Sequence, residues 1–141
     1  MKEKIQDKIS EIEDYLNVLN EIAPNSFEEY KSSYEKKWSC ERGFENIVEA
    51  IIDLAFLVIN EKQFKKKEDD LNVFDILAEN NIISLELSKK MQDAKGMRNI
   101  IVHEYGKIDD EIVFEAISSE LERDVRNFIN IIKIRLNGEV D

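Results

Sequence analysis

The sequence predicts an all-α fold, an up-and-down bundle of four to five helices. Three observations support this prediction. Apolar residues recur every three or four positions along most of the chain, no stretch alternates apolar and polar residues as a strand does, and the 141 residues include only four glycines and one proline. A chain of this length is expected to form a single domain, residues 1–141, that buries about two-thirds of its unfolded surface.

The first helix is expected from Lys2 to about Ile22, because apolar residues repeat there at helical spacing with acids between them. Pro24 ends this helix. Ser26 and Glu29 then form a capping box, in which each side chain satisfies the free backbone N–H group of the other residue. The box starts a short helix, with room for a break before Trp38.

The longest apolar segment predicts a central helix from about Trp38 to Lys62. Its buried face is wide, with one stripe at Phe44, Ile47, Ile51, Leu54 and Val58 and a second at Val48, Ile52, Ala55 and Ile59. A third, polar face carries Arg42, Asn46, Glu49, Asp53 and Asn60. This polar seam is either a solvated strip or a source of partners for a charged residue on a neighbouring helix.

A short helix is expected at residues 72–79, followed by a turn at 80–81 and a longer helix that opens near Ser84. The acids at 109–111 place negative charge at the positive end of one last long helix, which 137–138 ends. Its core stripe is expected to comprise Phe114, Ile117, Leu121, Val125, Phe128 and Ile132.

Composition limits where in the cell the protein is expected to act and which partners it is expected to bind. The only cysteine, Cys40, has no partner for an internal disulfide, and the longest uncharged run, 54–60, is far too short to cross a bilayer. The first 15 residues are charged throughout and do not read as a signal peptide. We therefore expect a cytoplasmic protein with no membrane partner. The net charge of −11 disfavours a broad RNA-binding surface, so any RNA site must be local.

The most informative stretch is residues 98–105, which holds the only histidine. Arg98 lies on an apolar helical stripe with Leu87, Met91, Ala94, Ile101 and Tyr105. Because a guanidinium is too costly to bury alone, this position indicates an interface, an internal ion pair or a polar cleft. Glu49 or Asp53 of the polar seam is the expected partner, which would orient Arg98 and keep it charged.

On an unbroken helix, His103 lies about 140° around the axis from Arg98 but one turn from Asn99. The Asn99 side chain is therefore expected to hold either the imidazole or a bound phosphate. Gly106 offers a C-cap that distorts the last turn, so His103 could swing towards Arg98. The structural alternatives are an ion-pair role for Arg98 and a capping or core role for His103.

Arginine and histidine together suit cleavage of an RNA phosphodiester without a metal or another cofactor. One histidine and one cysteine cannot form a His/Cys zinc cluster, and the sequence has no glycine-rich phosphate loop. Histidine can move protons near neutral pH, and arginine can stabilise the charged phosphoryl oxygens. Because one histidine cannot serve both sides of an in-line displacement, two copies are expected to face each other in a homodimer.

Arg98, His103 and Tyr105 match the R-x4-H-x-Y motif, so the sequence resembles the HepT-like branch of the HEPN superfamily. The order of expected helices over 38–136 and the step at 108–109 also resemble that family. The resemblance implies a HEPN-like bundle and a ribonuclease toxin that cleaves transfer RNA or messenger RNA. It also implies a minimal nucleotidyltransferase antitoxin that silences the toxin by AMPylation of Tyr105, with Arg98 and His103 as catalytic residues.

Two other classes remain open at this point. A non-catalytic helical module could bind a nucleotidyltransferase or its substrate, and the acidic net charge favours this alternative slightly. A purely structural helical dimer would leave Arg98 and His103 replaceable. For Tyr105 the structural alternative is a core or interface tyrosine.

Overall fold

The computed structural model describes residues 2–65, 72–103 and 109–137. These residues form seven α-helices and one π-helical segment, and they contain no strand, which confirms the all-α prediction. In chain order the elements are α1 (Lys2–Ile22), α2 (Phe27–Ser32), α3 (Tyr34–Lys62), α4 (Val73–Glu79), α5 (Leu85–His103), α6 (Asp110–Glu115), η1 (Ala116–Glu120) and α7 (Leu121–Asn137).

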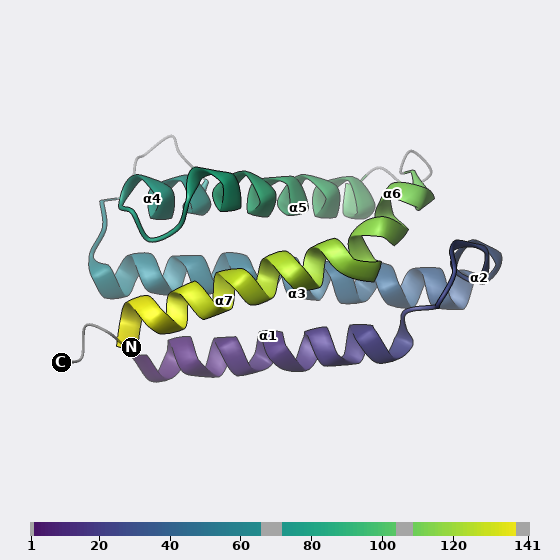
Figure 1. Ribbon diagram of the computed structural model, residues 1–141, viewed down its shortest axis with the longest axis horizontal. Helices are drawn as coiled ribbons and strands as arrows, with labels where there is room; N and C mark the ends of the chain where they lie inside the picture. The colour runs from purple at the N-terminus through teal and green to yellow at the C-terminus, as the bar shows by residue number, and fades with distance from the viewer. Residues whose placement is uncertain (1, 66–71, 104–108, 138–141) are drawn as a thin grey trace.

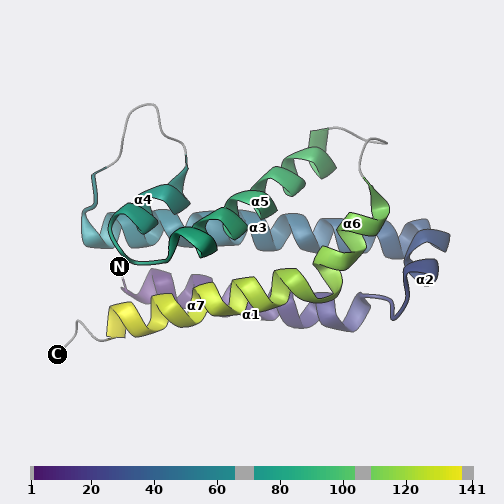
Figure 2. The ribbon, with the colours of Figure 1, turned by 45° about the horizontal axis from the view of Figure 1, so that its top comes forward.

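The four long helices α1, α3, α5 and α7 run up and down the length of the molecule (Figure 1). The longest, α3, packs along most of α1 on one side and contacts α4 and α5 on the other. Helices α3 and α5 are antiparallel, and Figure 2 shows that α5 diverges from α3 towards its C-terminal end. The expected up-and-down bundle is therefore confirmed.

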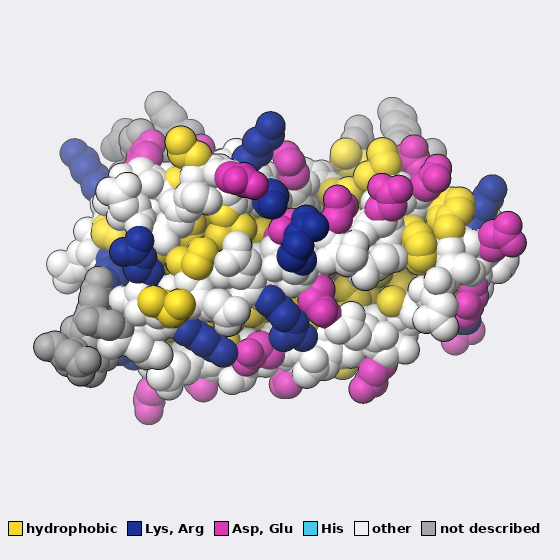
Figure 3. Space-filling view, viewed as in Figure 1, with side chains coloured by type: hydrophobic (Ala, Val, Ile, Leu, Met, Phe, Trp, Pro, Cys, Tyr) yellow, Lys and Arg dark blue, Asp and Glu magenta, His cyan; other side chains and the backbone are white. Residues whose placement is uncertain are grey.

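The surface carries both signs of charge. On the face that α7 crosses, lysine and arginine side chains are interspersed with acids (Figure 3). None of the described helices is both long and apolar enough to span a membrane.

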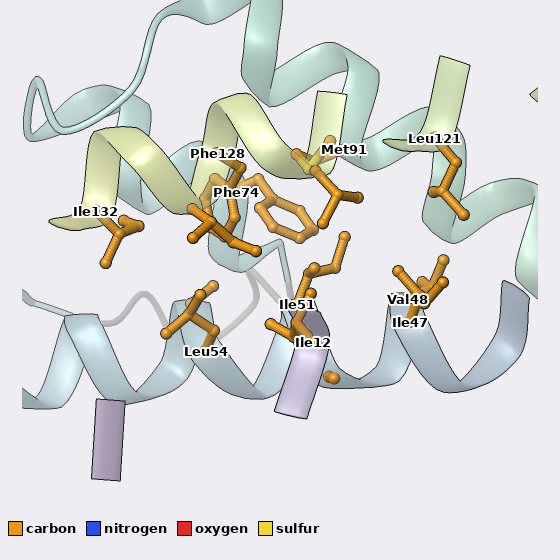
Figure 4. Packing of buried hydrophobic residues seen from close by; sticks show 14 of the residues in the cluster. Ile12, Ile47, Val48, Ile51, Leu54, Phe74, Met91, Leu121, Phe128 and Ile132 are labelled. Atoms are coloured by element: carbon orange, nitrogen blue, oxygen red, sulfur yellow. The ribbon is translucent and has the colours of Figure 1, made fainter. Parts of the chain in front are cut away.

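The core lies between the four long helices and α4 (Figure 4). Phe74 of α4 meets Phe128 of α7 edge to face, with 5.8 Å between the ring centroids. Such a pair adds to the free energy that burial of the rings provides. The labelled core residues are Ile12 of α1, Ile47, Val48, Ile51 and Leu54 of α3, Phe74 of α4, Met91 of α5, and Leu121, Phe128 and Ile132 of α7.

Capping side chains set the starts of several helices. The expected start of α2 is confirmed, since the Glu29 N–H donates to Ser26 Oγ at 3.2 Å. The Glu29 carboxylate itself pairs with Lys36 of α3. The expected start of the central helix at Trp38 is wrong by four residues, because Ser33 Oγ accepts from the Lys36 N–H at 3.3 Å and starts α3 at Tyr34.

The starts of α4, α5 and α6 agree with their sequence signals. Asn72 Oδ1 accepts from the Phe74 N–H at 3.2 Å, and Ser84 Oγ accepts from the Leu87 N–H at 3.0 Å. Asp109 caps α6 in the same way. Side-chain caps satisfy backbone donors that would otherwise lack a partner at a helix start.

The last helix differs from the single α-helix that we expected, because η1 interrupts it with a π-helical turn. The buried residues Val113, Ile117, Leu121 and Val125 lie four positions apart. In an α-helix each four-residue step turns about 40° too far, so three steps would rotate the stripe by about 120°. The wider π turn takes up this rotation and keeps all four side chains in the core.

Helix α6 packs against α2 and the first turn of α3. Lys37 Nζ lies 2.9 Å from Asp110 Oδ1. Phe114, which we expected in the core stripe, is instead half-buried, and its ring lies 5.9 Å from that of Phe27 and 5.5 Å from that of Tyr30. These contacts fix the point where the chain re-enters the bundle after α5.

Candidate active site

Arg98 projects from the C-terminal half of α5 towards α3. Its Nη2 atom lies 2.6 Å from Glu49 Oε1, so the two side chains form a charge-assisted hydrogen bond. The Arg98 side chain is 25% exposed and that of Glu49 is 46% exposed. Among the three environments that the sequence allowed, the described residues provide an ion pair at the rim of the α3–α5 contact.

Asp53, the other candidate partner, does not contact Arg98 in the described structure. Its carboxylate lies 3.6 Å from Lys8 Nζ of α1 and is 60% exposed. Glu49 and Asp53 are four residues apart, so they differ by about 40° around α3, and Asp53 turns towards α1. Most of the polar seam is therefore a solvated strip, and Glu49 is the member of it that reaches α5.

Asn99 supports the same guanidinium. Its Oδ1 atom accepts a hydrogen bond from Arg98 Nη1 at 3.1 Å. Within the described residues this is the contact that the Asn99 side chain makes, so it meets Arg98 and not His103. Arginine has five donors in a fixed fork, and these two contacts leave further donors for a ligand. Arg98 Nε is buried and has no hydrogen-bond partner among the described residues.

His103 is the last residue of α5 and is exposed to solvent. It lies five residues beyond Arg98, which is about 7.5 Å along the helix axis. Helical geometry continues to His103 itself, and the distortion that we expected from Gly106 lies outside the described residues, as does Tyr105. An exposed histidine at a helix end can reach a substrate or a second protein molecule without any rearrangement of the core.

Gly96 is a feature of this helix to which sequence analysis assigned no role. A Cβ atom built at Gly96 would meet nothing within 4 Å, although glycine in a helix interior costs about 1 kcal/mol relative to alanine. Together with Ile100 and Ile112, it lines an open groove between α5 and α6. The exposed fractions of Ile100 and Ile112 are 38% and 53%. A glycine inside an otherwise helical pattern was the available signal.

One face of α5, about 100° wide around the helix axis, carries Gln92, Gly96, Asn99, Ile100 and His103. This outward α5 face therefore joins an apolar patch to the histidine.

No group of three or more His, Cys, Asp or Glu side chains in residues 2–65, 72–103 and 109–137 is placed to hold a metal ion.

The fold and the site together define an all-helical bundle with an Arg/His pair on the last turns of one helix. The chain belongs to the ribonuclease HepT-like family, whose model matches residues 5–132. It is similar to a tRNA nuclease HepT of Aphanizomenon flos-aquae, with 32% identity over 119 residues that cover 84% of this chain and 81% of the relative. It is also 28% identical, over 133 residues, to an mRNA nuclease HepT of Shewanella oneidensis, covering 94% and 98% of the two chains.

Solved structures show the same fold. One is a tri-AMPylated HEPN toxin of Shewanella oneidensis in complex with an MNT antitoxin, with a TM-score of 0.85, 28% identity and coverage of 94% of this chain and 98% of that one. Another is a toxin–antitoxin complex with AMP-PNP, with a TM-score of 0.82, 27% identity and coverage of 92% and 96%. These likenesses confirm the HEPN-like bundle.

Proposed function

We propose that this chain is a metal-independent endoribonuclease, the toxin of a toxin–antitoxin pair that acts in the cytoplasm on transfer RNA or messenger RNA. The observation that carries the proposal is the Arg98 guanidinium, held by Glu49 and Asn99 five residues before the exposed His103. Membership of the HepT-like ribonuclease family and the names of the nuclease relatives support the same reaction.

The reaction needs little from the protein, because RNA carries its own nucleophile. His103 accepts the proton of the 2′-hydroxyl, O2′ bonds to phosphorus, and the bond from phosphorus to the 5′ oxygen breaks. The leaving oxygen takes a proton from a second acid, and the products are a 2′,3′-cyclic phosphate and a 5′-hydroxyl. Arg98 stabilises the charge that develops on the phosphoryl oxygens. Because each chain has one histidine, His103 of a second copy supplies the second acid.

The second copy docks on the outward α5 face, where Gly96 permits close approach of two helix backbones. Gly96→Gln is expected to convert the dimer to a monomer and to reduce RNA cleavage, while helicity stays the same because glutamine is a good helix former. Light scattering coupled to size exclusion measures the mass, and Gly96→Ala serves as the small-residue control. A dimer that survives Gly96→Gln with full activity would place the interface elsewhere.

Tyr105 is the proposed site of silencing, through AMPylation by a nucleotidyltransferase antitoxin. AMP groups two residues from His103 would add bulk and negative charge beside the site, and phosphate would be repelled. Incubation with such an antitoxin and ATP is expected to add AMP to the wild type and abolish cleavage, while Tyr105→Phe keeps its mass and its activity. Intact-mass measurement with a cleavage assay checks both. AMP found on another residue, or silencing that persists in Tyr105→Phe, would refute this role.

A further inference from the structure

Two large aromatic side chains are exposed together at the start of α3. Tyr34 is 72% exposed and Trp38 is 64% exposed. Their ring centroids lie 5.6 Å apart with an interplanar angle of 42°, so the rings contact each other on the surface. In the sequence, Trp38 marked only the expected start of the central helix. Their four-residue spacing, which puts both rings on one face of α3 beside the stripe that contains Ile52, was the available signal.

The aromatic pair lies in line with the candidate active site. One face of α3, about 80° wide around the helix axis, carries Tyr34, Trp38, Arg42 and Glu49. Glu49 holds Arg98, and Trp38 lies eleven residues before Glu49, which is about 16 Å along the helix. Because α5 runs antiparallel to α3, the direction from Glu49 to Trp38 is also the direction from Arg98 to His103 (Figure 1).

His103 lies about 7.5 Å beyond Arg98 along α5 by the same geometry. Trp38 and Tyr34 lie about 16 Å and about 22 Å beyond Glu49 along α3, so both rings are further along the bundle than the histidine. At this end of the bundle α5 diverges from α3 (Figure 2). Arg42 occupies the interval on α3. Its side chain is 68% exposed, and its Nη1 atom lies 3.6 Å from Glu45 Oε2. Arg42 therefore puts a positive charge between Arg98 and the aromatic rings, where it can bind a phosphate of an RNA strand that runs from one to the other.

Stacking is an attraction to RNA that this chain can offer in spite of its acidic net charge. The net charge of −11 weakens the phosphate attraction on which most RNA-binding proteins depend. Base–aromatic stacking does not depend on net charge, and unpaired bases stack readily on tryptophan and tyrosine. Paired bases are held inside a duplex and cannot reach exposed rings in this way.

We propose that Tyr34 and Trp38 form a stacking subsite for an unpaired nucleobase, on the His103 side of the phosphate that is cleaved. The place of the subsite in cleavage rests on the proposed ribonuclease function, whereas the stacking itself is measured without cleavage. The subsite selects single-stranded or looped RNA over duplex, because only an unpaired base can enter it.

Trp38 is the sole tryptophan, so its fluorescence reports on this place alone. The wild-type protein is titrated with single-stranded 2′-O-methyl RNA, which has no free 2′-hydroxyl and is not cut. We expect quenching of the Trp38 emission by the single strand and none by a matched blunt duplex. Fluorescence anisotropy of labelled strand is expected to give an affinity about ten-fold or more weaker for Trp38→Ala and Tyr34→Ala.

Trp38→Phe keeps a ring and is expected to recover most of the affinity. Leu85→Ala removes a 78% exposed apolar side chain at the far end of the molecule and is the matched control, with unchanged affinity. Binding of the strand without quenching of Trp38 would overturn the proposal. So would shielding of Trp38 from acrylamide in the protein alone, since that result makes the pair a protein–protein contact. Failure of the wild type to cut ordinary RNA would count against the ribonuclease function and leave the stacking result standing.

Discussion

Arg98→Ala is expected to lower the rate of RNA cleavage about 10²- to 10³-fold, the usual loss when one preorganised donor to a developing oxyanion is removed. Its guanidinium is held on two sides, by Glu49 at 2.6 Å and by Asn99 at 3.1 Å, so it meets the phosphate without first being ordered. Arg98→Lys is expected to recover only part of the rate, because an ammonium cannot reproduce the planar fork.

The fold should survive Arg98→Ala, because the side chain is partly exposed and its partner Glu49 stays in contact with water. Arg126→Ala is the matched control, since Arg126 is also a surface arginine with a carboxylate partner, Glu122, 3.7 Å away. Single-turnover rates and thermal midpoints of both variants check the expectation. Equal rates for Arg98→Ala and the wild type, or an equal loss in Arg126→Ala, would remove Arg98 from the site.

Much of the fold could be predicted because its signals are local. The bounds of α1 follow from an apolar repeat that Pro24 interrupts, and the starts of α2 and α5 follow from the hydroxyls of Ser26 and Ser84. The start of α3 was missed because Ser33 caps it without the carboxylate three residues later that completes a capping box. A lone serine in a charged stretch is a weak signal.

Other features depend on how the helices pack, which no single segment encodes. The π turn at η1 arises because α7 and α6 must present one stripe to a core whose other walls come from distant residues. Similarly, Glu49 and Asp53 are equivalent in sequence as partners for Arg98. The rotation of α3 between α1 and α5 decides between them, with Asp53 next to Lys8.

The exposed aromatic pair could be located from the sequence but not interpreted from it. Tyr34 and Trp38 have helical spacing, yet their relation to Arg98 depends on the antiparallel contact between α3 and α5. The motif around Arg98 and His103 indicated RNA cleavage, and the contact of Arg98 with Glu49 locates this candidate site where α5 meets α3.

His103→Ala is expected to reduce RNA cleavage about 10²- to 10⁴-fold, the range that loss of a general acid–base group produces. The loss affects both proton transfers, because each copy in the proposed dimer contributes its histidine to the shared site. Since His103 is exposed at the end of α5, we expect its removal to change the free energy of unfolding by no more than about 0.5 kcal/mol.

Metal-independent cleavage by His103 is tested most directly with two RNA substrates in EDTA. One is an ordinary RNA, and the other is the same RNA with a single 2′-deoxy nucleotide at the cleavage position. Both are incubated with the wild type and with His103→Ala. We predict that the wild type cuts the first RNA to a 2′,3′-cyclic phosphate and leaves the second intact at that position, while His103→Ala cuts neither at a comparable rate. Cleavage that requires added metal, that proceeds without the 2′-hydroxyl, or that His103→Ala retains would contradict the central claim.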